Sequence, residues 1–344
     1  MAANTSQPST MRAWTFSSGG MPDKVLSFNP SFPVPAAPKG SDILIKISHA
    51  SLSSPGSNLM RDIPSLLRKN AIPELDFSGR VVSAGPDVPG EYAAGVAVFG
   101  TVSKSGSIVH NQGTLAEYIV LNVNCIAVKP TNITFAEAAC LSCLGQVALE
   151  MVRQAKIKSG DRVLVNGGSG AVGSAAIQLC KDLGAFVTNL SLTKMQMIDY
   201  ALVKSIPAAL ENSYSASQFD AILDTVGSRE LFLRCPKYLK HEGVFINVGD
   251  GSEGRLSLIL HTLQNMLQPS ILGGVPRRYL TFSAPLNGQN AAYLGTLASK
   301  GKMMVFIDST FSLEDVINGY KRYKSGQAQG RVVIDISNMD TQDQ

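Results

Sequence analysis

Short apolar runs, separated by glycine, proline and serine, dominate the first third of the chain. They are ILIKIS (43–48), FSGRVVSAG (77–85), GVAVFG (95–100) and LAEYIVL (115–121). Alternating or clustered β-forming residues between turn residues predict short strands. We therefore expect a mostly β region over residues 1–130.

A different pattern begins at residue 131. Apolar positions at helical spacing run to about residue 157, and Thr134 and Glu137 have the spacing of a capping box. This pattern predicts one long helix. Beyond it, apolar strands expected at 162–166, 185–191, 219–227 and 243–249 alternate with helices. Such alternation predicts an α/β fold with a doubly wound parallel sheet over residues 131–285.

The last segment, residues 286–344, contains an apolar run at 306–311, a helical pattern at 313–326 and a second apolar run at 331–336. We expect a strand, a helix and a strand here, and we expect them to rejoin the β-rich region. A chain of 344 residues is long for one core, which also favours two domains.

Charge and composition narrow the classes of partner. The formal net charge is +4, without a dense Lys/Arg run, which argues against nucleic acid and suits an anionic cofactor or substrate. Because the chain has no apolar stretch of about 18 residues, we expect no membrane span. The polar start resembles no targeting segment, and five scattered cysteines favour a reducing compartment, so we expect a cytoplasmic protein.

The stretch VLVNGGSGAVGSAAIQL (163–179) joins an expected strand to an expected helix through glycines. Two overlapping patterns, G-x-G-x-x-G and G-x-x-G-x-x-G, end at Gly173. In this context glycines allow a tight turn, close approach of a pyrophosphate, and tight packing of helix on strand. The alternative is a glycine-rich turn that holds no ligand. The predicted dinucleotide-binding residues here are Gly167, Gly168, Ser169, Gly170, Ala171, Val172 and Gly173.

The second strand of the expected sheet indicates which dinucleotide is bound. NAD-binding sites place an acid at the end of this strand, but no acid occurs here before Asp199. Asn189, Ser191, Thr193 and Lys194 stand there instead. Hydroxyls and an ammonium group suit a 2′-phosphate, so the sequence predicts NADP(H). For Lys194 alone, the alternative is a solvated helix lysine.

Several segments together resemble one enzyme family, the medium-chain dehydrogenases/reductases, in their zinc-independent quinone oxidoreductase and enoyl reductase branch. LGGVPRRYLTF (272–282) resembles fungal members in particular, including the trans-acting enoyl reductases of polyketide pathways. The resemblance implies a GroES-like β-rich catalytic domain followed by a Rossmann domain, with the tail returning to the first domain. The matching segments are 113–121, 161–185, 219–227, 243–249 and 312–336.

The resemblance also implies roles for residues outside the glycine stretch. Tyr214 would lie near the 2′-phosphate, although a surface-loop tyrosine is an equal alternative. Further cofactor contacts would come from Val226, Gly227, Val248, Gly249, Leu272 and Gly273. Substrate contacts would come from Ser54, Arg61, Leu144 and Gly145.

The chain departs from zinc-dependent members of this family. Leu75 and Asp76 stand where those members have a His-Glu pair, so we expect no zinc. Cys140 and Cys143 are better explained as packed small side chains than as metal or redox ligands. The loop at 53–75 also lacks the tyrosine that some enoyl reductases use as a proton donor. The catalytic residue therefore stays unassigned.

These observations predict an enzyme, an NADPH-dependent reductase of an activated C=C bond in an enone, an enoyl thioester or a quinone. A conjugated acceptor spreads charge to its oxygen, so a few hydroxyl or backbone donors suffice without a metal. The expected substrate is a largely apolar conjugated carbonyl compound. The alternative is a non-catalytic NADPH-binding pathway partner or sensor. The strand expected at 277–285 predicts a homodimer, while the resemblance also leaves open a monomer that serves a polyketide synthase.

Overall fold

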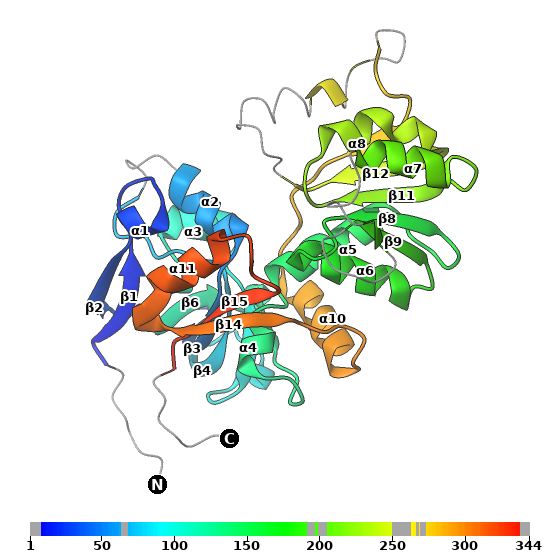
Figure 1. Ribbon diagram of the computed structural model, residues 1–344. Coiled ribbons are helices and arrows are strands. Elements are labelled where there is room, and N and C mark those ends of the chain that lie inside the picture. Colours follow the sequence, from blue (N-terminus) through cyan, green and yellow to red (C-terminus); the bar gives the residue numbers. More distant parts are fainter. Residues whose placement is uncertain are drawn as a thin grey trace. The chain divides into compact units, whose positions relative to one another are not determined.

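The computed structural model describes residues 8–62, 68–190, 197–198, 205–249, 263–265, 268 and 273–337. The chain forms two compact units, one of Met1–Cys143 with Leu286–Gln344 and one of Leu144–Pro285 (Figure 1). Residues 131–143 thus belong to the first unit, because the helix that they contain packs against two of its strands.

The first unit is built mainly on antiparallel strand pairs, and strands overlap the four apolar runs at 43–48, 77–85, 95–100 and 115–121, as predicted. A two-stranded sheet pairs β1 with β2, and a seven-stranded sheet has the order β14-β15-β3-β4-β5-β7, with β6 paired to β3. The strands are β1 (Thr10–Thr15), β2 (Ser27–Pro33), β3 (Asp42–Ser51), β4 (Asp76–Ala84), β5 (Ala97–Thr101), β6 (Tyr118–Asn122), β7 (Ile126–Val128), β14 (Ile307–Ser312) and β15 (Arg331–Asp335).

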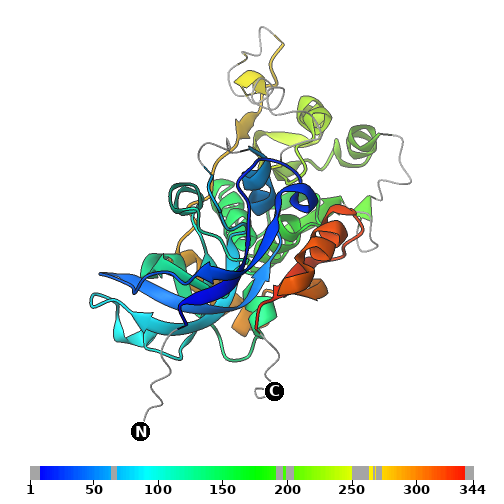
Figure 2. The same cartoon turned by 90° about the vertical axis from the view of Figure 1, so that its left-hand side faces the viewer.

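Helices cover the sheets of this unit. Helix α10 packs against β7, and α11 packs against β14 and β15 and contacts α1 (Figure 2). The helices are α1 (Pro22–Val25), α2 (Ser54–Asp62), α3 (Lys104–His110), α4 (Phe135–Ala138), α10 (Gly288–Ser299) and α11 (Val316–Lys324), with 3₁₀ turns at Gly90–Tyr92, Val123–Cys125 and Leu313–Asp315.

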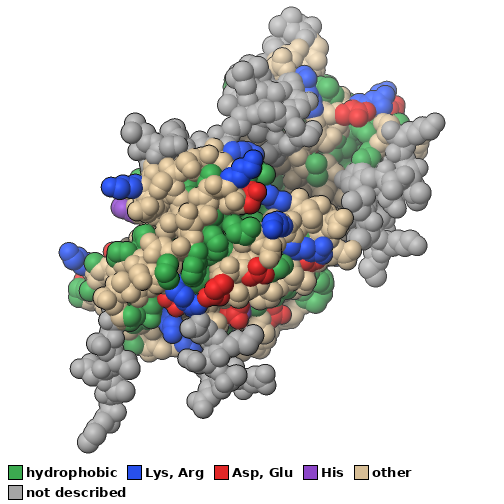
Figure 3. Space-filling view, turned by 60° about the vertical axis from the view of Figure 1, so that its left-hand side comes forward, with side chains coloured by type: hydrophobic (Ala, Val, Ile, Leu, Met, Phe, Trp, Pro, Cys, Tyr) green, Lys and Arg blue, Asp and Glu red, His purple; other side chains and the backbone are tan. Residues whose placement is uncertain are grey.

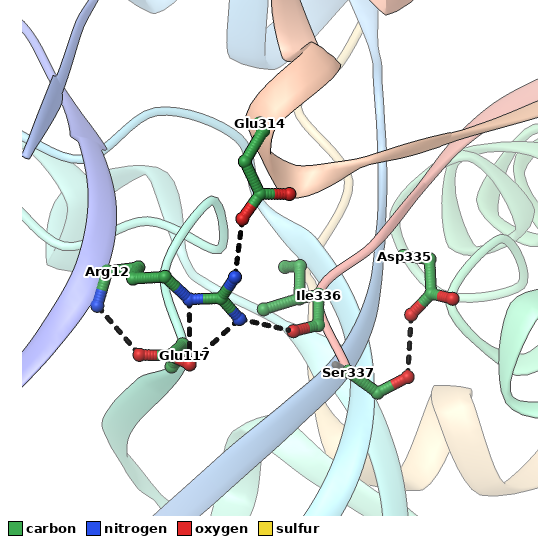
Figure 4. A network of polar contacts seen from close by, with 6 residues as sticks. All are labelled: Arg12, Glu117, Glu314, Asp335, Ile336 and Ser337. Atoms are coloured by element: carbon green, nitrogen blue, oxygen red, sulfur yellow. Dashed lines mark hydrogen bonds and ion pairs between the residues drawn. The ribbon is translucent and has the colours of Figure 1, made fainter. Parts of the chain in front are cut away.

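The C-terminal segment completes the sheet of the first unit, as expected. β15 pairs antiparallel with β3, placing Val333 opposite Ser51, and parallel with β14. A polar network fixes this return (Figure 4): Arg12 of β1 bonds Glu117 and Glu314, and reaches the carbonyl oxygen of Ile336. One guanidinium group thereby joins the first strand to the last segment of the chain.

The second unit is a parallel six-stranded sheet with the order β10-β9-β8-β11-β12-β13. Numbered within the unit, this is the order 3-2-1-4-5-6 of a doubly wound dinucleotide-binding fold. The elements are β8 (Arg162–Asn166), α6 (Ala171–Asp182), β9 (Phe186–Leu190), β10 (Met197–Ile198), α7 (Ile206–Tyr214), β11 (Phe219–Asp224), α8 (Arg229–Arg234), a 3₁₀ turn at Cys235–Lys237, β12 (Leu239–Asn247) and β13 (Arg278–Leu280).

The single long helix predicted after residue 134 is wrong. The predicted capping box of Thr134 and Glu137 is present, but it opens the four-residue helix α4, and α5 (Cys143–Gln154) starts anew. The chain tightens between them, since Cys140 N bonds the Glu137 carbonyl three residues back. The buried carboxylate of Asp76 then accepts the Cys143 N–H at 2.8 Å, which stabilises the second helix start.

The surface of the described chain mixes charges of both signs. Figure 3 shows basic and acidic side chains interspersed with apolar ones over the first unit. Among the described residues, none of the helices is both long and apolar enough to cross a bilayer.

Candidate functional site

The predicted glycine turn joins β8 to α6 in the second unit. Gly167 has φ +84°, a left-handed conformation that favours glycine. A Cβ atom on Gly173 would lie 2.2 Å from the Gly167 carbonyl oxygen, so helix and turn approach more closely than any side chain permits. Both positions therefore require glycine, for the physical reasons that the motif predicts.

The start of α6 fits an anionic group. Its N-cap residue, Gly170, has no side chain with which to cap the helix, and both Ser169 and Gly170 are exposed. The first-turn N–H groups of a helix lack partners within the helix, and its dipole attracts negative charge. Ser169, Gly170, Ala171 and Val172 thus offer a backbone cradle of the kind that binds a pyrophosphate.

The structure gathers the turns that follow three parallel strands. A Cβ on Gly167 would lie 2.8 Å from a methyl carbon of Val226, and one on Gly249 would lie 2.2 Å from the Val226 carbonyl carbon. The predicted cofactor residues Val226, Gly227, Val248 and Gly249 therefore lie beside the glycine turn. Ligands of open parallel sheets bind at this carboxyl edge.

A buried carboxylate that the sequence analysis missed shapes this edge. Asp224, the last residue of β11, accepts bonds from the backbone N–H groups of Val226, Gly227 and Ser228 and from the Asn166 amide, at 2.7–3.1 Å. Burial raises the pKa of Asp224, and these hydrogen bonds oppose the rise. Its only signal in the sequence is an acid that ends an apolar strand.

Asn189, near the end of β9, lies against the glycine turn. A Cβ on Gly168 would approach its carboxamide carbon to 2.9 Å. Its Oδ1 atom is buried, and within the described chain it has no hydrogen-bond partner. An uncharged acceptor therefore stands where NAD-specific sites carry an acid, and it suits a ribose hydroxyl without repelling a phosphate. The predicted residues Ser191, Thr193, Lys194 and Leu272 lie outside the described residues.

The structure does not bring Tyr214 to this edge. Tyr214 ends α7, and its ring packs 4.7 Å from that of Phe219, the first residue of β11. The glycine turn lies at the opposite, carboxyl end of the strands, and six strand residues span roughly 20 Å. We therefore assign Tyr214 to packing. Gly273 has φ +84° and precedes β13 by five residues.

A second polar group of residues lies in the first unit around Glu74, which is 1% exposed. Its carboxylate accepts bonds from the Ser53 backbone N–H and hydroxyl at 3.0 and 2.9 Å and from the Tyr320 hydroxyl at 2.6 Å. Desolvation raises the pKa of Glu74 to about 7, and the Tyr320 and Ser53 hydrogen bonds oppose this rise. The sequence analysis did not single out Glu74 or Tyr320.

The other predicted site residues lie near this group or in the second unit. The Ser54 hydroxyl lies 2.6 Å from that of Tyr323 on α11. Arg61 is exposed in the last turn of α2. Leu144 is half-buried and Gly145 is buried in the first turn of α5, within the second unit.

A family model described as "Zinc-binding dehydrogenase" matches residues 195–334. "Medium chain reductase pydE" of an Acremonium species is 33% identical over an alignment that covers 95% of this chain and 99% of the relative. The chain belongs to the medium-chain dehydrogenase/reductase family. Like other proteins of this family that share its fold, it is an oxidoreductase enzyme.

Further medium-chain dehydrogenases/reductases align over nearly their full length. "Trans-enoyl reductase poxH" of Penicillium oxalicum is 27% identical over 96% of this chain and 98% of the relative. The solved quinone oxidoreductase from Coxiella burnetii superposes with a TM-score of 0.75 at 25% identity, covering 95% of this chain and 99% of that one. Both support the two-domain architecture and a nicotinamide cofactor, which this family typically uses.

The residues at the position of the family's zinc pair do not fit a metal. Leu75 is a fully buried apolar side chain, and Asp76, also buried, faces Arg331 with 3.6 Å between Oδ2 and Nη2. Burial raises the pKa of the Cys140 thiol to about 11, and Cys140 and Cys143 are both buried and outside any disulfide, which fits the predicted packing role. Among the described residues, no three His, Cys, Asp or Glu side chains group as a metal site would require.

Proposed function

We propose that this protein is an NADPH-dependent reductase that transfers hydride to an activated C=C bond. The observation that carries the proposal is the glycine turn with its uncapped helix start, together with Asn189 in the place of an acid. This arrangement suits the pyrophosphate and ribose of a dinucleotide without repelling a 2′-phosphate.

Each part of the cofactor has residues that would hold it. The backbone of Ser169, Gly170, Ala171 and Val172 would bind the pyrophosphate, and the turns at 226–227 and 248–249 would line the ribose and nicotinamide. Ser191, Thr193 and Lys194 would surround the 2′-phosphate. When bound, the cofactor supplies a hydride to an electrophilic carbon.

The proposed substrate class follows from the donors that the first unit offers. Hydroxyl groups stand at Ser54 and Tyr323, while Leu75 and the arginine-paired Asp76 replace metal ligands. Hydroxyl donors suffice to stabilise an enolate, whereas a simple ketone needs stronger activation. The names of the relatives, trans-enoyl reductase and quinone oxidoreductase, support an enone, an enoyl thioester or a quinone.

Cofactor preference tests the first half of the proposal. Binding of NADPH and NADH is titrated by fluorescence for the protein and for Lys194→Ala, with Lys181→Ala, near the end of α6, as the matched control. Loss of a charged contact of about 1.5–3 kcal/mol weakens NADPH binding roughly ten- to a hundredfold and leaves NADH little changed. Equal affinity of the unaltered protein for both dinucleotides would overturn the NADPH assignment.

The position of hydride transfer tests the second half. A panel of quinones, enones and enoyl thioesters is incubated with NADPH deuterated at the transferable position. Label on the β-carbon of an enone or enoyl product supports C=C reduction, whereas label on a carbinol carbon would mean carbonyl reduction. NADPH binding without oxidation across the panel would instead favour the non-catalytic partner or sensor.

We also propose a homodimer that pairs the edge strand β13 with its copy. β13 bonds β12 on one side and is the last strand in the described sheet order. Pairing covers its unpaired backbone groups. Light scattering at micromolar concentration measures the mass. A monomer would contradict the pairing. It would favour an enzyme that acts as a single chain, and a synthase-bound thioester would then be the next substrate to test.

A further inference from the structure

Two pairs of hydroxyl side chains, Ser53 with Tyr320 and Ser54 with Tyr323, connect the start of α2 to α11 in the first unit. Ser53 and Ser54 are adjacent at the start of α2, and Tyr320 and Tyr323 lie three residues apart on α11. Residues at this spacing share a helix face. Ser53 and Tyr320 both bond Glu74, while Ser54 bonds Tyr323 directly.

Glu74 holds this arrangement under local constraint. Its φ of +68° is a left-handed conformation that few residues other than glycine adopt, and such strain persists where the surroundings fix it. A Cβ on Gly56 would lie 2.1 Å from Oε2 of Glu74, so α2 is packed directly on the carboxylate. The Gly56 N–H in turn donates to the Ser53 hydroxyl at 3.1 Å.

The two pairs differ in their access to solvent. Ser53, Glu74 and Tyr320 are each at most 2% exposed. Ser54 is exposed and Tyr323 is half-buried. Of these residues, Ser54 and Tyr323 are therefore the ones that solvent reaches, while the other three are enclosed.

We propose that Tyr323 is the proton donor of the reduction, that Ser54 is its hydrogen-bond partner, and that Glu74 is a positioning residue that holds both. This inference rests on the proposed function. After hydride reaches the acceptor, its charge lies on the carbonyl oxygen. The Tyr323 O–H bond breaks, an O–H bond forms on the substrate, and the phenolate regains a proton from water through Ser54.

Proton transfer to oxygen suits all three proposed acceptors. A quinone becomes a hydroquinone, whereas an enone or enoyl thioester becomes an enol that converts to the saturated carbonyl compound in water. One NADPH and one proton are consumed for each acceptor reduced, so the step balances.

The charges around the pair keep the donor protonated. Burial raises the pKa of Tyr323, and the Ser54 hydrogen bond opposes the rise. The charge of Glu74 also raises the pKa of Tyr323, and that of Arg331 on β15 lowers it. Glu74 itself interacts with Tyr320 and Asp76. Tyr323 therefore carries its proton at neutral pH, as a general acid must.

The test compares Tyr323→Phe and Ser54→Ala with the unaltered protein on an acceptor that the unaltered protein reduces. We expect kcat to fall by about 10²-fold or more in Tyr323→Phe, while the Kd for NADPH changes less than about twofold. The upper limb of the pH profile, set by the donor, should disappear. Tyr293→Phe, on the exposed side of α10, is the matched control and should keep the full rate.

A second measurement needs no turnover. p-Nitrophenolate carries a conjugated oxyanion, and its visible absorbance shifts when it accepts a strong hydrogen bond. We expect Tyr323→Phe to weaken its binding roughly tenfold or more, as for loss of a hydrogen bond to a charged group. Ser54→Ala should weaken binding less. Glu74→Gln should weaken it without changing the Kd for NADPH, because it displaces the pair and leaves both hydroxyls present.

The two proposals fail separately. If the unaltered protein reduces none of the acceptors, the proposed function fails. If it reduces one, and Tyr323→Phe folds with an unchanged kcat, pH profile and p-nitrophenolate affinity, the proton-donor assignment is overturned. Should Tyr323→Phe not fold, Ser54→Ala, at an exposed position, decides by the same measurements, and an unchanged kcat and affinity there overturns the pair.

Discussion

The Tyr320 hydroxyl donates a 2.6 Å hydrogen bond to the Glu74 carboxylate, although 246 positions separate the two residues. The contact is fully buried and binds the C-terminal helix α11 to the segment that precedes β4. A carboxylate in such surroundings takes up a proton more readily than in water, and this has a measurable effect on stability.

We predict that the folded protein loses stability as pH rises from about 4.5 to 7. Burial raises the pKa of Glu74 from 4.5 to about 7, so the folded state holds a proton in this range that the unfolded state has released. The stabilisation from protonated Glu74 is fully present below about pH 4.5 and is lost above about pH 7. It contributes at most about 3 kcal/mol to the free energy of unfolding. Urea unfolding at several pH values measures the effect.

The variant Glu74→Gln isolates this contribution, because it cannot titrate. Its stability should fall less steeply over the same range. Asp76, whose pKa burial raises to about 6, acts in the same direction and stays in the variant, so part of the slope remains. An identical slope in both proteins would show that Glu74 titrates normally.

The glycine turn predicts a contrast between two glycines. A Cβ on Gly173 would lie 2.2 Å from a backbone oxygen, so Gly173→Ala must distort the turn and should lower stability by about 2 kcal/mol or more. A Cβ on Gly170 meets its nearest atom at 3.3 Å, a contact that a small shift relieves. Gly170→Ala should therefore fold normally but bind dinucleotide less tightly, since its methyl group would stand at the proposed pyrophosphate site.

Thermal unfolding and NADPH titration measure both effects. Gly90→Ala is the control, because nothing lies within 4 Å of a Cβ there. Unchanged NADPH affinity in Gly170→Ala would mean that the phosphates bind elsewhere.

Asp224 predicts a large effect in the second unit. Asp224→Asn removes the charge that four N–H donors share, and it turns the NH₂ group of the new side chain toward one of those donors. We therefore expect the free energy of unfolding to fall by about 2–4 kcal/mol. The turn at 225–228 should loosen, and dinucleotide binding should weaken with it. Chemical denaturation measures the loss, with the exposed Glu242→Gln as control. Equal stability of the two variants would contradict this role.

The Arg12 network predicts that the chain ends stabilise the first unit. Arg12→Ala removes the bonds to Glu117, Glu314 and the Ile336 carbonyl (Figure 4), from a side chain that is 20% exposed. We expect a loss of about 1–2 kcal/mol, above that of an ordinary surface pair. Unfolding monitored by Trp14 fluorescence measures it, and exposed Lys39→Ala, which should cost nothing measurable, provides the baseline.

The sequence by itself determined the features that depend on near neighbours. The apolar runs predicted the strands, the Thr134–Glu137 spacing predicted a capping box, and the glycines after β8 predicted the tight turn and the helix that follows. These features follow from backbone geometry over a few residues, and local geometry is what a sequence pattern expresses. The resemblance to a known family added the two-domain architecture to these local predictions.

Only the tertiary structure decided which distant residues meet. Asp76 stabilises the start of a second helix within the expected long one, because its carboxylate reaches the Cys143 N–H across 67 positions. Tyr214 packs on Phe219, far from the glycine turn, and the Tyr323 hydroxyl meets that of Ser54 across 269 positions. Burial and long-range contacts set these outcomes, because an acid or a tyrosine has one chemistry in water and another beside a buried partner.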